Sequence, residues 1–271
     1  MKSLQVAHLF GVQGKKVLIT GGGRGIGLMI ARGFVANGAH VFISSRDAEA
    51  CQTAATELTA AGPGTCVALP EDLSSVAACE RLAARLSELA EALHVLVNNS
   101  GVAWGEPLER ASEKGFDKVF ALNVKALFFL TKALLPLLTA GSSVEDPARV
   151  INIGSIAGLQ NQPFPTFFYD ASKAAVHHLT RKLADELASK RGVGKRITVN
   201  AIAPGYVPSR MSAGLEQYTQ PGAEDKLARI PLARLGNGAD MAGAALFLAS
   251  PAGSWITGIV LPVDGGYLAK L

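Results

Sequence analysis

Two hydrophobic patterns alternate along the whole chain: short runs of β-branched and other apolar residues, and longer Ala- and Leu-rich segments of helical period. The runs predict strands at Val17–Thr20, Val41–Ser44, Thr65–Leu69, Val95–Asn98, Val150–Ile153, Thr198–Ile202 and Gly258–Leu261. The longer segments predict helices at Ile26–Asn37, Ala48–Ala60, Ser74–Ala92, Phe116–Leu138, Ala171–Lys190 and Asp240–Ala249. Strands that are apolar throughout and alternate with helices belong to a parallel sheet covered on both faces. We therefore expect an α/β, doubly wound fold with a seven-stranded parallel sheet.

The longest segment without a predicted strand is 206–236. No interdomain linker or internal repeat interrupts the alternation, so we expect residues 1–271 to form one domain. In doubly wound folds, ligands bind beyond the carboxyl ends of the strands. The 206–236 segment is therefore expected to be a substrate lid loop.

Composition excludes several classes of protein. With 49% hydrophobic and 18% charged residues, the chain is neither disordered nor fibrous. A net charge of +4, spread along the chain, is compatible with an anionic ligand. There is no basic helix or aromatic platform that would indicate binding to nucleic acid.

Cys51, Cys66 and Cys79 form no CxxC pair and lack a nearby histidine, which argues against a disulfide framework or a metal site and suits a reducing compartment. The N-terminus lacks the features of a signal peptide. The apolar stretch 119–138 is interrupted by polar residues and a proline, so it does not predict a membrane span. We expect a cytoplasmic protein that does not associate with membranes.

A glycine-rich turn directly follows the first predicted strand and opens the first helix. Glycines allow the backbone to approach a pyrophosphate, and the helix N-terminus supplies N–H donors. No Lys-Ser/Thr pair follows, which disfavours a triphosphate-hydrolysing loop. The candidate nucleotide-binding residues of this turn are Gly21, Gly23, Arg24, Gly25, Ile26 and Gly27.

The end of the second strand favours NADP(H) over NAD(H). An acidic residue here would bind the ribose of NAD, but Ser45 and Arg46 stand at this point. Arg46 can neutralise a 2′-phosphate, and Arg24 in the glycine turn can join it. The alternative interpretation is that both arginines are ordinary solvated surface residues.

Ser155, Tyr169 and Lys173 are the candidate catalytic group. Tyr169 and Lys173 are four residues apart on a predicted helix, so they share a face. A neighbouring ammonium favours the phenolate, so Lys173 is expected to lower the pKa of Tyr169 and make it a usable acid and base. Ser155 follows a strand and is placed to hold a substrate carbonyl by a hydrogen bond.

Taken together, these motifs resemble those of the short-chain dehydrogenase/reductase family. The motifs occur in the family's order across nearly the whole chain: Thr20–Gly27, Asp72-Leu73, Asn98–Gly101, Asn123, Ser155, Tyr169–Lys173, Asn200-Ala201, Pro204-Gly205 and Val263–Gly266. Within the family, Ala148–Gly154 and Pro208–Met211 are most similar to NADPH-dependent 3-oxoacyl reductases of the rhamnolipid-associated type.

The resemblance implies a Rossmann domain that binds NADP(H), and it assigns a role to each matching residue. Tyr169 would be the acid/base, Lys173 would also bind the nicotinamide ribose, and Ser155 would orient the carbonyl. Asn123 would anchor a water of the proton relay, although a hydrogen bond to backbone is a compatible interpretation of it and of Asn99. Further cofactor contacts are implied for Asp72, Leu73, Asn99, Gly101, Val207 and Ser209, whereas Asn200 and Asp264 are interpreted as structural.

The sequence departs from the family pattern at several positions. Ser100 replaces the usual alanine, and the Asp170 carboxylate is expected to point away from Tyr169 because it would otherwise raise the pKa of that residue. The aromatic loop Phe164–Phe168 is expected either to wall a substrate pocket, with Trp104 and Tyr206, or to pack on a neighbouring subunit. The cationic pairs Lys190-Arg191 and Lys195-Arg196 are either a docking patch for a carrier protein or a charged helix end.

The sequence thus predicts an oxidoreductase that uses NADPH to reduce a ketone. The expected substrate is a 3-oxoacyl thioester or a similar ketone. The alternatives are a polyol or secondary-alcohol dehydrogenase of the same family and a non-catalytic NADPH-sensing protein, which would not need the catalytic set. The apolar helices Phe116–Leu138 and Ala171–Lys190 also predict a homodimer or homotetramer.

Overall fold

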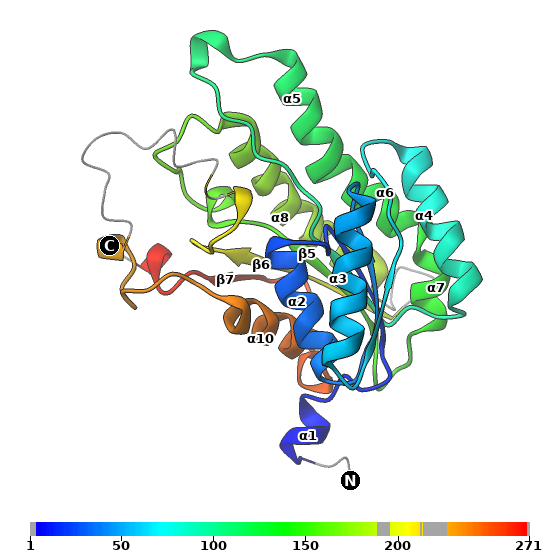
Figure 1. The fold of residues 1–271 in the computed structure, drawn as a ribbon. Helices are drawn as coiled ribbons and strands as arrows, with labels where there is room; N and C mark the ends of the chain where they lie inside the picture. Colours follow the sequence, from blue (N-terminus) through cyan, green and yellow to red (C-terminus); the bar gives the residue numbers. More distant parts are fainter. Residues whose placement is uncertain (1–3, 189–195, 212, 214–226, 270–271) are drawn as a thin grey trace.

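The computed structural model describes residues 4–188, 196–211, 213 and 227–269. Within these residues, seven parallel strands form one sheet in the order β3-β2-β1-β4-β5-β6-β7 (Figure 1). The strands are β1 (Lys16–Thr20), β2 (His40–Ser44), β3 (Thr65–Ala68), β4 (Val95–Asn98), β5 (Ala148–Ile153), β6 (Ile197–Pro204) and β7 (Val260–Val263). The predicted doubly wound α/β fold, with its seven-stranded parallel sheet, is confirmed.

Helices cover both faces of the sheet and create two hydrophobic cores. In β1, Val17 and Ile19 face one core, while Leu18 between them faces the other. This explains why the strand has no polar alternation, since successive side chains point to opposite buried faces. The first core lies under α2 (Gly25–Ala36), α3 (Ala48–Ala61) and α10 (Gly238–Ala249). The second lies under α4 (Val76–Leu89), α6 (Ala126–Ala133), α7 (Leu135–Ala140) and α8 (Phe167–Leu187).

The predicted single helix Phe116–Leu138 is wrong in detail. The chain forms α5 (Glu113–Phe120), a π-helical turn (Ala121–Lys125) and α6. It then bends at Leu134 and continues as α7. Pro136 lies in the first turn of α7, where its missing N–H costs no helical hydrogen bond. The proline therefore marks the start of a new helix.

Several other boundaries differ from the prediction, among them those of α8 and β7. Helix α8 begins at Phe167, so Tyr169 is in its first turn, and the predicted end at Lys190 lies outside the described residues. Strand β7 begins at Val260 and not at Gly258, because Gly258 has φ +79°, outside the extended range of a strand. The short helix α1 (Val6–Leu9) was not predicted, since four residues show no helical period.

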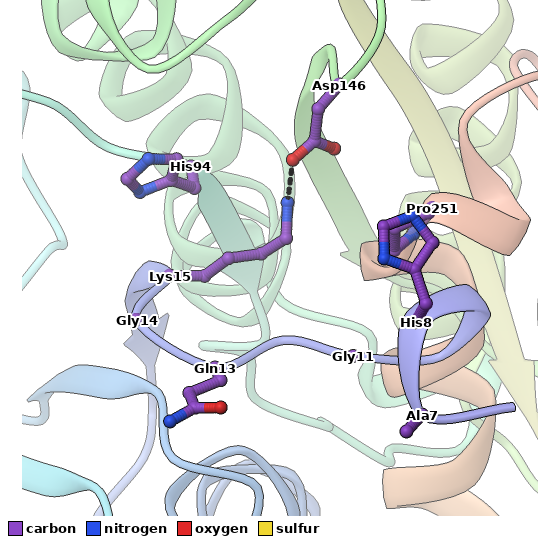
Figure 2. Close-up of a pocket in the computed structure, with 9 residues that line it drawn as sticks. All are labelled: Ala7, His8, Gly11, Gln13, Gly14, Lys15, His94, Asp146 and Pro251. Atoms are coloured by element: carbon purple, nitrogen blue, oxygen red, sulfur yellow. Dashed lines mark hydrogen bonds and ion pairs between the residues drawn. The ribbon is translucent and has the colours of Figure 1, made fainter. Parts of the chain in front are cut away.

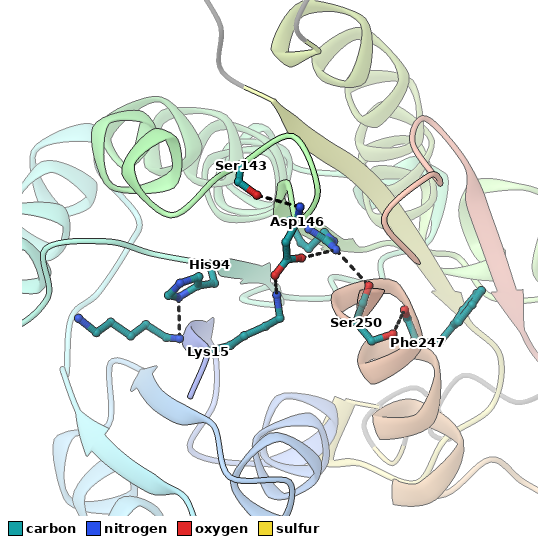
Figure 3. A network of polar contacts seen from close by, with 8 residues as sticks. Lys15, His94, Ser143, Asp146, Phe247 and Ser250 are labelled. Carbon is teal, nitrogen blue, oxygen red and sulfur yellow. Dashed lines mark hydrogen bonds and ion pairs between the residues drawn. The ribbon is translucent and has the colours of Figure 1, made fainter. Parts of the chain in front are cut away.

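A polar network closes the amino ends of the strands (Figure 3). Lys15, which precedes β1, forms an ion pair with Asp146, which precedes β5. Asp146 also accepts a hydrogen bond from Arg149 (2.8 Å), and the 1% exposed Arg149 donates to the Ser250 carbonyl (3.1 Å). Such paired charges can be buried because each one offsets the desolvation of the other.

A hollow of about 390 Å³ adjoins this network (Figure 2). Its walls come from α1, the loop before β1 and residues next to the amino ends of β4 and β5, including His8, Lys15, His94 and Asp146. It therefore lies at the opposite end of the sheet from the carboxyl edge, where ligands of doubly wound folds bind. None of the predicted site residues lines it.

Candidate active site

The glycine turn is held tightly against the loop that follows β4. Gly21 has φ +64°, which favours glycine, and a Cβ there would lie 2.7 Å from the Asn99 Nδ2. The Asn99 amide donates to the carbonyls of Thr20 (2.9 Å) and Gly21 (3.2 Å). Gly27 offers no room for a side chain between the Gly21 carbonyl and Asn99. The backbone interpretation of Asn99 is confirmed, and its ribose contact stays a prediction.

Two cationic side chains lie where the glycine turn meets the end of β2. Arg24 belongs to the turn, and Arg46 follows the strand. The Ser45 hydroxyl lies beside Gly23 and donates to the Asp47 carbonyl (3.0 Å). The Asp47 carboxylate caps α3 by accepting from Ala50 N (3.1 Å). Arg24 and Arg46 are exposed, and neither side chain forms a hydrogen bond or an ion pair within the described part of the chain. Both guanidinium groups are therefore available to an anion.

The other predicted cofactor contacts also gather at the carboxyl ends of the strands. A Cβ at Gly25 would have Ser209 as its nearest neighbour, so the segment after β6 reaches the glycine turn. Asp72 is exposed and accepts from Ser74 N (3.2 Å), whereas Leu73 and Val207 are buried. The remaining residues, Gly101 after β4 and Ile26 at the start of α2, are partly exposed.

Tyr169 lies next to Ser155 in a nearly closed environment. Burial raises the pKa of Tyr169 to about 12, and the neighbouring Ser155 hydroxyl offsets part of that rise. The Ser155 Oγ also accepts from Ala157 N (3.1 Å). One of its two lone pairs is thereby used, and its own proton can still be donated to an acceptor. At neutral pH Tyr169 is a protonated phenol.

Lys173 contacts the face of the Tyr169 ring and not the hydroxyl. Its Nζ lies 5.5 Å from the ring centroid and donates to the Ile153 carbonyl (2.7 Å). Burial lowers the pKa of Lys173 to about 8. The expected net lowering of the Tyr169 pKa by Lys173 does not hold, because the pKa is raised on balance. The desolvation of the phenolate outweighs the attraction of the ammonium that lies over the ring.

Asn123 occupies the π-helical turn between α5 and α6. Its Oδ1 accepts from Val102 N (2.8 Å), and its Nδ2 donates to the Val102 carbonyl (3.0 Å) and the Ser172 hydroxyl (2.9 Å). This amide therefore fixes the loop after β4 to α8. The backbone interpretation is confirmed, while the water-anchoring role stays a prediction. Single π-helical turns are often found at functional sites.

Asp170 is turned toward the preceding loop. Its carboxylate accepts from the Thr166 hydroxyl (2.9 Å), and burial raises the pKa of Asp170 to about 6. Its charge makes the smallest of the contributions to the pKa of Tyr169, and that contribution is a rise. The expectation that it points away is met only in part.

The aromatic loop packs on this chain. The Phe168 ring meets Phe116 of α5 edge-on at 5.4 Å. The Glu106 N–H donates to the Pro165 carbonyl (3.0 Å), and the Tyr206 hydroxyl donates to Gln162 (3.3 Å). The loop thus joins the segments after β4 and β6 around the catalytic group. Its contact with a second subunit stays a prediction.

Sequence reasoning missed several residues that hold this site together: Glu106, Gln162, Thr166, Ser172 and His177. The available signal was on α8. Tyr169, Ser172, Lys173, Val176 and His177 are all buried and follow helical spacing, so the buried face of this helix is mostly polar. Buried polar side chains require partners, which the strands and loops around α8 supply.

The remaining predictions concern the cysteines, metal binding, membrane spans and two cationic or loop segments. The three cysteines are buried and free, and burial raises the pKa of Cys66 to about 12 and of Cys79 to about 11. Within the described ranges, no cluster of His, Cys, Asp and Glu could hold a metal ion, and no helix is long and apolar enough to cross a membrane. The cationic residues 190, 191 and 195, and residues 212 and 214–226 of the predicted 206–236 lid, lie outside the described residues.

Comparisons with known proteins agree with this geometry. The model of the family described as Enoyl-(Acyl carrier protein) reductase matches residues 21–268. The rhamnolipids biosynthesis 3-oxoacyl-[acyl-carrier-protein] reductase of Pseudomonas aeruginosa is 48% identical over 258 residues, covering 95% of this chain and 98% of that protein. Galactitol 2-dehydrogenase (L-tagatose-forming) of Cereibacter sphaeroides is 37% identical over 96% of this chain and 97% of its own length.

A solved structure extends the comparison to the fold. The Pseudomonas aeruginosa RhlG/NADP active-site complex matches with a TM-score of 0.87 and 48% identity, covering 96% of this chain and 98% of that chain. The fold, the order of the motifs and these similarities lead to one assignment. The chain belongs to the short-chain dehydrogenase/reductase family and is an oxidoreductase of that family.

Proposed function

We propose that this protein reduces a ketone to a secondary alcohol with NADPH. The observation that carries the proposal is the arrangement of Tyr169: a buried, protonated phenol that lies near the Ser155 hydroxyl and under the Lys173 ammonium. The group lies at the carboxyl edge of the sheet, next to the glycine turn. A phenol in this state is a proton donor to a carbonyl oxygen.

The residues around the glycine turn fit NADP(H). The glycine turn leads into the N-terminus of α2, whose N–H groups suit a pyrophosphate, and a Cβ at Gly25 would meet only Ser209 within 4 Å. Arg24 and Arg46 offer unpaired guanidinium groups, and the nearby Asp47 carboxylate is already used in capping α3. A 2′-phosphate would therefore meet attraction from both arginines. NADP is also present in the complex of the 48% identical relative.

The chain's own residues divide the chemical work. The bound cofactor would supply a hydride to the carbonyl carbon. The Ser155 hydroxyl donates a hydrogen bond to the substrate oxygen and fixes its direction. Tyr169 transfers its proton to that oxygen, and the Lys173 ammonium stabilises the phenolate that remains. The buried surroundings of Tyr169 and Lys173 exclude water and strengthen both interactions.

We propose a 3-oxoacyl thioester as the substrate class, because the 48% identical relative is a 3-oxoacyl-[acyl-carrier-protein] reductase. The 37% identical galactitol 2-dehydrogenase supports a second candidate, oxidation of a polyol or other small secondary alcohol. A sensor that binds NADPH without turnover is disfavoured, since it would have no use for the Ser155, Tyr169 and Lys173 group.

The test is a panel assay of NADPH oxidation by the purified protein. The panel contains 3-oxoacyl thioesters, small diketones and ketoses, with the corresponding alcohols and NADP⁺ for the reverse direction. We expect fastest turnover with a 3-oxoacyl thioester. Faster turnover of a ketose or polyol would support the second candidate, and tight NADPH binding without any turnover would support the sensor.

We also propose a cytoplasmic location and assembly into a homodimer or homotetramer. The three free, buried cysteines suit the reducing conditions of the cytoplasm and support the proposed location. Partly exposed aromatic rings on α5 and α8, Phe116 and Phe167, support the second.

A further inference from the structure

His177 is a buried histidine to which the proposed chemistry assigns no role. It lies on α8, one turn beyond Lys173, and only 2% of its surface is exposed. Its imidazole packs directly beneath the turn that carries Ser155. A Cβ at Gly154 would collide with the ring, and one at Gly158 would lie 2.8 Å from its Cε1. The two glycines that flank the turn therefore allow the ring to approach the backbone.

The hydrogen bonds of this turn show what the ring does. The Ile153 carbonyl accepts from Lys173 (2.7 Å), and the Gly154 N–H donates to the Ile202 carbonyl (2.8 Å). The Ser155 carbonyl accepts from Gly158 N (3.0 Å), and the Ser155 Oγ accepts from Ala157 N (3.1 Å). The Ser155 N–H is left, and it donates to the Nε2 of His177 over 3.5 Å. Buried backbone donors are almost always paired, so this contact completes the turn.

The protonation state of His177 suits an acceptor. Burial lowers the pKa of His177 to about 4; the Gly158 backbone offsets part of this, and the charges of Lys173 and Arg181 lower the pKa further. The neutral ring has one bare nitrogen, which must be Nε2 if it accepts from Ser155. Nδ1 then carries the proton. Hydrogen bonds at active sites are often long without ligand and shorten in the reacting complex.

We propose that His177 is a positioning residue that fixes the backbone of Ser155 and thereby aims the Ser155 hydroxyl at the substrate carbonyl. The inference rests on the proposed role of Ser155 in ketone reduction. His177 touches no substrate or cofactor atom in this scheme. Its effect passes through a single backbone N–H, so it acts on the direction of the Ser155 hydroxyl and not on the binding of NADPH.

The experiment compares three substitutions in the full-length protein. His177→Leu keeps the side chain apolar and bulky but removes the acceptor. His177→Gln places an amide oxygen near the position of Nε2. His178→Leu is the matched control, because the neighbouring histidine is exposed. The readouts are kcat for ketone reduction and the Kd of NADPH measured by fluorescence titration.

We expect His177→Leu to lower kcat about tenfold while the Kd of NADPH changes less than about twofold. His177→Gln should recover most of the loss, and His178→Leu should behave as wild type. Unchanged kcat in His177→Leu would overturn the inference. So would a loss of NADPH affinity in proportion to kcat, since that indicates a general structural role.

A double-mutant cycle with Ser155→Ala separates positioning from other effects. If His177 acts through Ser155, His177→Leu should cost little further kcat in the Ser155→Ala background. Independent, multiplicative losses would contradict the inference. If the leucine variant does not fold, His177→Asn takes its place, since its shorter amide cannot reach the Ser155 N–H while that of His177→Gln can.

The outcomes also separate this inference from the proposed function. Absence of ketone reduction in the wild type contradicts the proposed function itself. A full kcat in Ser155→Ala contradicts the role of Ser155 and overturns the inference with it. A low kcat in Ser155→Ala together with a full kcat in His177→Leu overturns only the positioning role of His177.

Discussion

At Tyr169 and Lys173, burial acts on two groups of opposite charge type: it favours the protonated phenol that reduction requires, and it weakens the ammonium without removing it at neutral pH. It raises the pKa of Tyr169 to about 12, so the phenol keeps its proton until a carbonyl oxygen takes it. It lowers the pKa of Lys173 to about 8, so the ammonium persists at neutral pH but with a small margin. Tyr169 thus supplies the acid. Lys173 supplies the positive charge that stabilises the resulting phenolate.

Replacement of the phenol tests the role of Tyr169. Tyr169→Phe retains the ring, so we expect NADPH to bind with nearly wild-type Kd. Turnover should fall at least about a hundredfold, because only the proton transfer is lost. The Kd from fluorescence titration and the steady-state kcat provide the comparison. Retention of more than about a tenth of wild-type turnover would show that another group is the acid.

The pH profile tests Lys173. As pH rises through about 8, Lys173 loses its proton. The phenolate left on Tyr169 is then no longer stabilised, so kcat for reduction should fall with increasing pH. Tyr169 itself stays protonated over this range because its pKa is about 12. We expect one descending limb in a plot of kcat against pH, with its midpoint near 8. A profile that is flat or rises across that midpoint would contradict this assignment.

Among the elements, the interrupted helix α5–α6 connects the site to the fold. Its π-helical turn places the Asn123 amide between the backbone of Val102 and the hydroxyl of Ser172. One side chain thus ties the loop after β4 to α8, the helix that carries Tyr169 and Lys173.

Loss of the Asn123 amide should destabilise the fold. Asn123→Ala leaves the buried polar groups around it without partners, and we expect the free energy of unfolding to fall by about 2–4 kcal/mol. Urea unfolding followed by circular dichroism measures the change. Asn37→Ala is the control, since Asn37 donates one hydrogen bond at the exposed end of α2 (2.8 Å) and should cost less than about 1 kcal/mol. Equal losses in the two variants would argue against the bridging role.

Elements with a strong period could be predicted from the sequence, whereas boundaries set by single contacts could not. The apolar runs were sufficient to predict the parallel sheet. The spacing of Tyr169 and Lys173 was sufficient to predict that they share a helix face. The π-helical turn was hidden, because residues 116–133 keep a nearly helical hydrophobic pattern through it. His177 was missed because a histidine on a buried helix face has no spacing signal of its own, and its partner, Ser155, is 22 residues away.

For the whole molecule, surface composition predicts self-association. Phe116 is 42% exposed and Phe167 is 48% exposed, on adjacent helices α5 and α8. Covering such aromatic surface by a second copy removes it from water. We expect light scattering at micromolar protein to give about twice or four times the chain mass of 28.1 kDa. A mass equal to that of one chain would contradict the prediction.

NADPH-dependent reduction is the proposed activity, and it can be tested by measuring which cofactor the wild type prefers. A charge-assisted contact of Arg46, joined by Arg24, with a 2′-phosphate is worth about 1.5–3 kcal/mol, and about 1.4 kcal/mol is tenfold in affinity. With one accepted ketone, kcat/KM for NADPH should exceed that for NADH by about one to two orders of magnitude. The double variant Ser45→Asp, Arg46→Ala should erase or reverse this ratio by adding repulsion and removing attraction. Equal use of NADH and NADPH by the wild type would contradict the account and leave Arg46 as a solvated surface residue.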